Sequence, residues 1–111
     1  MRSLPLPTAL VLAMLAALPA SAATSPDATV SIENFTFAPA TITVPAGTTV
    51  VWVNHDDIPH LVAADDKQFK SPALDTDDRY ARRFDAPGTY AYFCGLHPHM
   101  TGKVVVMPGA P

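Results

Sequence analysis

Residues 94–100 read CGLHPHM and hold the only cysteine of the chain, two of its four histidines and one of its four methionines. Cys94, His97 and Met100 fall three residues apart, so a curled segment can bring all three side chains to one point. Pro98 stiffens this segment. A thiolate, an imidazole and a thioether are soft donors that select copper over magnesium or calcium. The spacing therefore predicts a copper site.

Two other interpretations of Cys94 stay open at this point. A free cysteine is often a buried structural thiol. A thiol near a histidine can also be a nucleophile with its base. The nucleophile needs an orienting acid, which residues 94–100 lack, and it leaves Met100 without a role. A metal site gives all three side chains a function.

The segment NHDDIPH at residues 54–60 offers two candidates for a further ligand. His60 follows Pro59 and precedes an apolar run, so we expect it where a loop re-enters the sheet and can point inward. His55 lies beside two aspartates and is expected to face solvent. Two histidines, a cysteine and a weak axial methionine make the blue-copper arrangement, which serves electron transfer. The predicted ligands are His60, Cys94, His97 and Met100.

The elements that must position these ligands are predicted to be strands. Seven segments show period-two alternation or β-branched and aromatic enrichment: 29–37, 40–44, 48–54, 60–64, 79–84, 89–94 and 102–107. Pro and Gly punctuate the turns at 45–47 and 86–88. Residues 65–78 are polar and irregular, and are expected to form one long loop or a short helical turn. An all-β, antiparallel sandwich or barrel suits this pattern, with residues 94–100 as a connection between its last two strands.

The N-terminus differs from the rest of the chain. Arg2, an apolar run and the small residues before Ala23 describe a secretory signal peptide over residues 1–22. Cleavage is expected after Ala22, with Ala23 as the alternative. A membrane anchor is the other interpretation, although the run is short for a span and contains prolines. Residues 23–29 are expected to be a flexible lead-in, and residues 30–111 one small domain.

Export and charge restrict the function. A lone cysteine cannot form an internal disulfide, so in an oxidising compartment Cys94 needs burial or a metal. Removing Arg2 changes the formal net charge from −3 to −4. This mild acidity disfavours nucleic acid and anionic membranes as partners. Seven aspartates form exposed loops or a docking patch: Asp56, Asp57, Asp65, Asp66, Asp75, Asp77 and Asp78.

Two long segments resemble the cupredoxins of the plastocyanin and azurin group, and amicyanin most of all. They are FTFAPATITVPAGTTVVWVNHDDIPH at 35–60 and GTYAYFCGLHPHMTGKVVV at 88–106. The resemblance implies an eight-stranded Greek-key sandwich that binds one type 1 copper through His60, Cys94, His97 and Met100. It also implies that the edge of His97 reaches the surface within an apolar patch that includes Leu96 and Pro98.

Two positions depart from the pattern of that family. Cupredoxins usually carry asparagine after the first ligand histidine, where it ties the ligand loops together, but here Leu61 follows. We therefore expect a looser or differently braced site. His99 stands where amicyanin-like loops are often apolar or aromatic, and it is a bystander, a docking residue or a rival ligand.

The leading hypothesis is a monomeric periplasmic carrier that is not an enzyme. It would take single electrons from a dehydrogenase and pass them to a c-type cytochrome or an oxidase in transient encounters. A copper chaperone or storage protein is the alternative, which the low number of methionines weakens. Too few histidines are present for the additional copper centres of an oxidase or nitrite reductase.

Overall fold

A computed structural model describes residues 2–5 and 26–109, and every structural statement below concerns these residues. Nearly all of the expected signal peptide and both candidate cleavage positions lie outside the described residues. Within them, no helix is long and apolar enough to cross a membrane.

Eight strands form the described domain, arranged in two sheets of four. One sheet has the order β2-β1-β4-β6 and the other has the order β3-β8-β7-β5. The all-β sandwich expected from the sequence is confirmed. The strands are β1 (Asp27–Glu33), β2 (Thr36–Ala38), β3 (Thr41–Pro45), β4 (Thr48–Asn54), β5 (Val62–Ala64), β6 (Arg79–Phe84), β7 (Gly88–Cys94) and β8 (His97–Met107).

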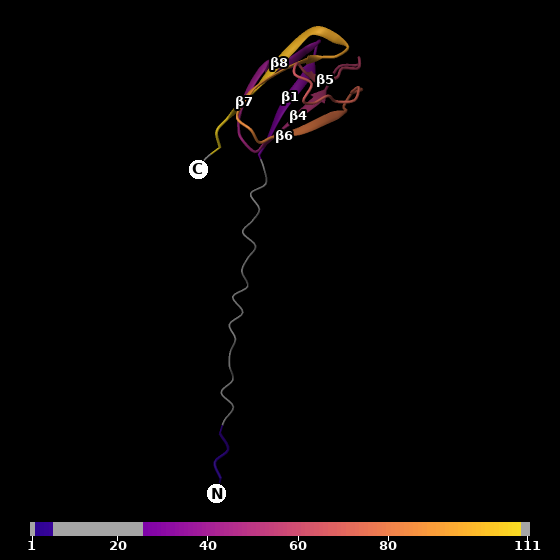
Figure 1. Cartoon of the computed structure of the whole chain (residues 1–111). Coiled ribbons are helices and arrows are strands. Elements are labelled where there is room, and N and C mark those ends of the chain that lie inside the picture. The colour runs from indigo at the N-terminus through magenta and orange to yellow at the C-terminus, as the bar shows by residue number, and fades with distance from the viewer. Residues whose placement is uncertain (1, 6–25, 110–111) are drawn as a thin grey trace.

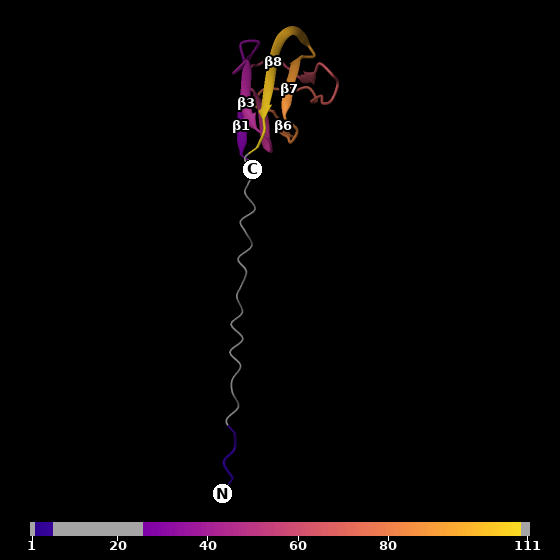
Figure 2. The same cartoon turned by 60° about the vertical axis from the view of Figure 1, so that its left-hand side comes forward.

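The pairing is mixed rather than antiparallel throughout, which corrects the sequence-based expectation. β1 runs parallel to β4, and β3 runs parallel to β8. The other strand pairs are antiparallel. Figure 2 shows β3, β8 and β7 side by side in the sheet β3-β8-β7-β5. Parallel neighbours cannot be joined by a tight hairpin, so a pattern of short turns along the chain does not reveal them.

Alternating side chains explain why these segments form a sandwich. On β1, Val30 and Ile32 are buried, and on β8 the buried positions from Met100 to Val106 are two residues apart. Trp52 on β4 and Tyr92 on β7 meet edge to face at the centre, with ring centroids 5.4 Å apart. The core therefore lies between two inward faces, as period-two burial requires.

Two strands, β1 and β8, begin earlier in the chain than the sequence predicted. β1 begins at Asp27, so residues 27–29 of the expected lead-in belong to a strand that pairs with β4. β8 begins at His97, and Cys94 pairs with His97 across a turn formed by Gly95 and Leu96. The connection from Cys94 to Met100 is therefore a tight hairpin rather than a seven-residue loop. This hairpin lies at the end of the domain opposite the C-terminus (Figure 1).

Residues 65–78 contain no helix and are instead held to the sheets by hydrogen bonds. His60 and Leu74 exchange two backbone hydrogen bonds of 3.1 and 2.7 Å. The backbone N–H of Val62 donates to the hydroxyl of Ser71 at 2.8 Å. Through these bonds, the expected long loop is held in a defined position beside the segment that carries His60.

Candidate metal centre

Three of the predicted ligands come together at the hairpin end. The side-chain donor atoms of His60, Cys94 and His97 all lie within 4.8 Å of one another. The Sγ of Cys94 is 3.6 Å from Nδ1 of His60 and 3.6 Å from Nδ1 of His97. Both imidazoles thus present the same nitrogen to the thiol. A thiol sulfur and two imidazole nitrogens, with no carboxylate among them, are the donors of a blue-copper site.

The other three candidates occupy different positions. Met100 is buried, with 6% of its surface exposed, and packs in the same hydrophobic core as Cys94. His99 lies on β8 next to Met100, and the alternation of the strand leaves it exposed. His55 is exposed as well. Neither His55 nor His99 belongs to the cluster of donors in the described part of the chain.

Asp56 orients His60 from the side opposite the cluster. Oδ2 of Asp56 lies 2.8 Å from Nε2 of His60, so His60 can donate from Nε2 and keep Nδ1 free to bind a metal. Burial raises the pKa of Asp56, but hydrogen bonds from the Phe35 and Asn34 backbones and from His60 together outweigh it and leave this pKa below its ordinary value. Asp56 is thus held as a carboxylate.

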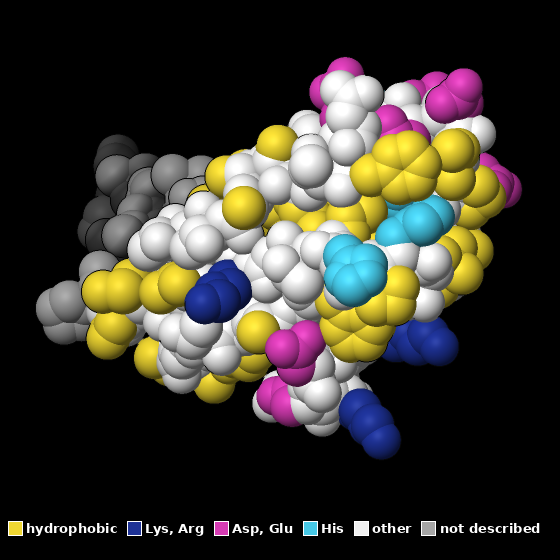
Figure 3. Space-filling model, turned by 90° about the horizontal axis from the view of Figure 1, so that it is seen from above, with side chains coloured by type: hydrophobic (Ala, Val, Ile, Leu, Met, Phe, Trp, Pro, Cys, Tyr) yellow, Lys and Arg dark blue, Asp and Glu magenta, His cyan; other side chains and the backbone are white. Residues whose placement is uncertain are grey.

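Phe35 packs against both histidines. Its ring centroid lies 5.3 Å from that of His60 and 5.0 Å from that of His97, with both pairs near perpendicular. Phe35 is 45% exposed, so it covers the imidazoles from the solvent side. Figure 3 looks onto this end and shows histidine side chains among hydrophobic ones, with acidic side chains both at the upper right margin and on the lower side.

The segments that carry His60 and Cys94 are joined by backbone and apolar contacts. These contacts involve Leu61, the residue that stands where cupredoxins usually have an asparagine. The N–H of Gly95 donates to the carbonyl of Leu61 at 3.2 Å. A Cβ added at Gly95 would stand 2.4 Å from Cδ1 of Leu61. Between the two ligand segments, a leucine side chain therefore packs directly on a glycine.

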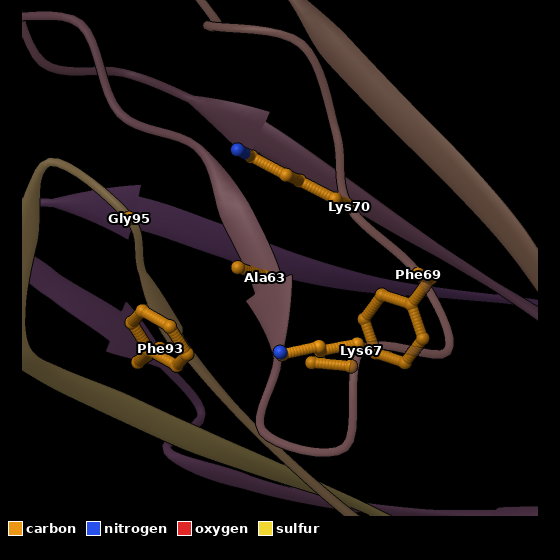
Figure 4. A pocket seen from close by; sticks show the side chains of 7 residues that line it. Ala63, Lys67, Phe69, Lys70, Phe93 and Gly95 are labelled. Carbon is orange, nitrogen blue, oxygen red and sulfur yellow. The ribbon is translucent and has the colours of Figure 1, made fainter.

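A separate hollow of about 480 Å³ lies beside the cluster rather than over it. It runs along the edge of β5, and Figure 4 shows the side chains of Lys67 and Lys70 on either side of Ala63, with Phe93 and Gly95 facing them. Its lining contains none of the metal-donor side chains. This hollow is therefore a surface feature next to the centre, distinct from the metal cluster.

Sequence reasoning missed two residues that shape the centre. Asp56 was assigned only to an acidic group, and Phe35 only to a strand. The available signal for Asp56 was its position four residues before His60, in a turn rich in aspartate. For Phe35 there was no local signal, because its contacts with His60 and His97 join distant parts of the chain.

Comparison with known proteins agrees with this arrangement. Residues 6–106 match the family model described as a cupredoxin-like domain. An amicyanin from Paracoccus versutus is 40% identical over 82 residues, which cover 69% of this chain and 62% of that protein. An amicyanin-alpha from Methylorubrum extorquens is 38% identical over 82 residues, covering 69% of each. The chain thus spans less than two thirds of the length of the Paracoccus versutus relative.

Solved structures are similar over most of the chain. A purple cupredoxin from Nitrosopumilus maritimus shares 35% identity, with a TM-score of 0.70 over 73% of this chain and 100% of that one. A Cu(I) form of an amicyanin mutant shares 32% identity, with a TM-score of 0.70 over 76% and 85%. A copper-containing nitrite reductase from Thermus scotoductus shares 34% identity, with a TM-score of 0.69, but only 23% of the reductase is covered. By the extent of the family match and the identity to amicyanins, the chain belongs to the cupredoxin family.

Proposed function

We propose that this chain binds one copper ion through His60, Cys94, His97 and Met100 and carries single electrons. The observation that carries the proposal is the convergence of one thiol and two imidazole Nδ1 atoms within 4.8 Å, from segments 34 residues apart. The buried Met100 beside them is the candidate for the weak axial ligand.

The protein supplies a rigid and partly dry site for this ion. The bound metal supplies a Cu(I)/Cu(II) couple. Cys94 and His60 are fully buried, which keeps water from the thiolate and from one imidazole. The hydrogen bond from His60 to Asp56 and the packing of the β-sandwich hold the donors in one arrangement for both oxidation states. His97 is half-buried, so its imidazole reaches from the cluster to the surface.

The decisive measurement is the visible spectrum of the apoprotein titrated with Cu(II). We expect one equivalent to give an intense thiolate-to-copper absorption, and Cys94→Ser to abolish it while the fold is retained. His55→Gln is the matched control, because His55 lies outside the cluster, and it should leave the absorption unchanged. A pale wild-type protein with only weak bands would contradict the proposal.

We propose a carrier in preference to an enzyme or a copper store. The described residues hold a single cluster of this kind, whereas a copper reductase or oxidase requires a further centre for its substrate. Reversible electrochemical cycling with the copper retained supports a carrier. Loss of copper on each reduction would favour the chaperone or storage alternative.

The partners and location follow from the same proposal. The signal-peptide pattern supports a periplasmic location. The electron donor would be a dehydrogenase and the acceptor a c-type cytochrome or an oxidase. Carriers of this kind act as monomers in brief encounters with small interfaces. If exposed aspartates such as Asp75 and Asp77 guide a basic cytochrome, its reaction rate in stopped flow should fall as ionic strength rises. A reaction rate that does not change with ionic strength would contradict electrostatic guidance by these aspartates.

A further inference from the structure

The turn between β1 and β2 has a left-handed backbone conformation, which is unusual for the phenylalanine in it. Asn34 and Phe35 have φ angles of 52° and 57°, both in the left-handed region. Asparagine tolerates this conformation, but a bulky aromatic residue rarely adopts it. Such a conformation persists only where surrounding contacts impose it, and it often marks a functional position.

Glu33 and Thr36 pair across this two-residue turn, a hairpin geometry that itself requires positive φ at both central residues, and the carboxylate of Asp56 binds the N–H groups that the turn presents. Its Oδ1 accepts the backbone N–H of Asn34 at 2.7 Å, and its Oδ2 accepts the N–H of Phe35 at 3.0 Å. Two successive N–H groups can converge on one carboxylate because the turn is left-handed. The same Oδ2 lies 2.8 Å from Nε2 of His60. One side chain therefore joins the β1–β2 turn to a metal-binding histidine.

Asp56 is itself fixed at its backbone. Its N–H donates to the side chain of Asn54 at 2.9 Å, and its carbonyl accepts the hydroxyl of Thr76 at 2.6 Å. Asn54 is fully buried and donates in turn to the carbonyls of Ile58 and Leu74 at 3.0 and 2.8 Å. The carboxylate consequently has a defined place from which it can order a turn about 20 residues away.

The consequence of this turn is the position of Phe35. Its ring meets His60 and His97 edge to face, although nearly half of the side chain is exposed. A phenylalanine on a free turn would have no reason to keep such a position in water. Among the residues that the structure describes, the thiol of Cys94 is the hydrogen-bond partner of His97, so the Phe35 ring is one of the few contacts that limit the rotation of this imidazole.

We propose that Asp56 is a positioning residue for both histidines, acting on His60 by a hydrogen bond and on His97 through Phe35. By binding both N–H groups of the β1–β2 turn, Asp56 keeps the Phe35 ring as a cover that slows the release of His97 and of the metal. This role deepens the proposed copper site and rests on it. The competing view is that Asp56 orients His60 alone and Phe35 is an independent surface residue.

The first test uses the apoprotein and therefore does not depend on copper. Amide hydrogen exchange at Asn34 and Phe35 should be about tenfold faster in Asp56→Ala, because two hydrogen bonds to a charged group are lost. Asp57→Ala removes the same charge one position along, from an exposed side chain, and should leave both amides unchanged. If Asp56→Ala does not fold, Asp56→Asn keeps the shape and turns one acceptor into a donor. Unchanged exchange in a folded Asp56 variant overturns the proposal.

The second test measures the cover itself. The rate of Cu(I) transfer to excess bicinchoninate should rise about tenfold in Phe35→Ala, the size expected for two lost edge-to-face ring pairs. Asp56→Ala should also raise it, and Asp57→Ala should not. In the double variant Asp56→Ala/Phe35→Ala, the increase in the Cu(I) transfer rate should be well below the product of the two single increases, because Asp56 acts partly through Phe35. Independent, multiplicative effects would show that Asp56 works through His60 alone.

These tests separate two kinds of failure. A protein that binds no copper would sink the proposed function, yet the exchange measurement would still report whether Asp56 orders the turn. Normal copper binding with unaltered exchange and release in the Asp56 and Phe35 variants would sink only this inference.

Discussion

The two histidines of the centre are held in opposite ways. His60 is fully buried, and its ring is fixed by Asp56 on one side and by the thiol of Cys94 on the other. His97 is half-buried next to the turn of the β7–β8 hairpin and contacts the same thiol through Nδ1, and no described residue is bonded to its other ring nitrogen. The contrast indicates a division of roles, in which His60 anchors the site and His97 connects it to the surface.

The largest test of this contrast is to delete each ring in turn. In His97→Gly the vacated space opens to solvent, so added imidazole should enter and restore most of the thiolate-to-copper absorption. In His60→Gly the space is enclosed, because His60 is fully buried, and a free imidazole has no open path to it. Imidazole should not restore that variant. The measurement is the visible absorption of each copper-loaded variant during titration with imidazole. Equal rescue of the two variants would contradict the distinction between the two histidines.

A second test addresses the seam between the two ligand segments. In Gly95→Ala the new methyl group would overlap the side chain of Leu61, which is 9% exposed and has little room to move. We expect a loss of about 1–3 kcal/mol in the free energy of unfolding, measured by denaturant titration of the apoprotein. Gly109→Ala is the matched control, because its nearest neighbour would be 3.6 Å away, and it should change stability by less than about 0.5 kcal/mol. Equal stability of the two variants would contradict the tight seam.

A third test concerns the core beneath the hairpin. Burial raises the pKa of Tyr92 from its ordinary value of 10.0 to about 12. The folded state therefore holds this proton more tightly than the unfolded state, so stability is complete below pH 10 and falls as pH rises towards 12. The loss should reach about 3 kcal/mol for a difference of about two pKa units.

Tyr92→Phe isolates this effect. Tyr80, whose pKa is also raised by burial, remains in both proteins, so the difference between their alkaline stability curves reports Tyr92 alone. Within residues 2–5 and 26–109, no group lies in good hydrogen-bond geometry to the buried Tyr92 hydroxyl, so removing this hydroxyl should not destabilise the protein at neutral pH. A wild-type curve parallel to that of Tyr92→Phe above pH 10 would contradict the assignment.

The smallest expected effect belongs to His99. It lies next to Met100 on β8 but on the exposed face, so it should neither bind the metal nor support the core. His99→Gln should keep the full copper absorption and change stability by less than about 0.5 kcal/mol. A lost or shifted absorption band would make His99 a rival ligand and blur the contrast between an anchored and an exposed histidine.

Local patterns were sufficient to predict much of this structure. Alternation located most of the strands, because side chains on a strand point in turn to core and solvent. β2 was joined to β1 in the sequence-based prediction, since the turn at Asn34 and Phe35 contains neither Gly nor Pro. The parallel pairs β1–β4 and β3–β8 were not foreseen, because pairing between distant strands leaves no periodic signal.

The centre divides in the same manner. The identity and spacing of Cys94, His97 and Met100, with His60 upstream, are properties of the sequence, because donor chemistry depends on residue type. Which atoms face one another is decided by the tertiary structure. The carboxylate of Asp56 meets His60 and the β1–β2 turn, and the ring of Phe35 meets both histidines, only because two sheets bring separate turns to the same end of the molecule.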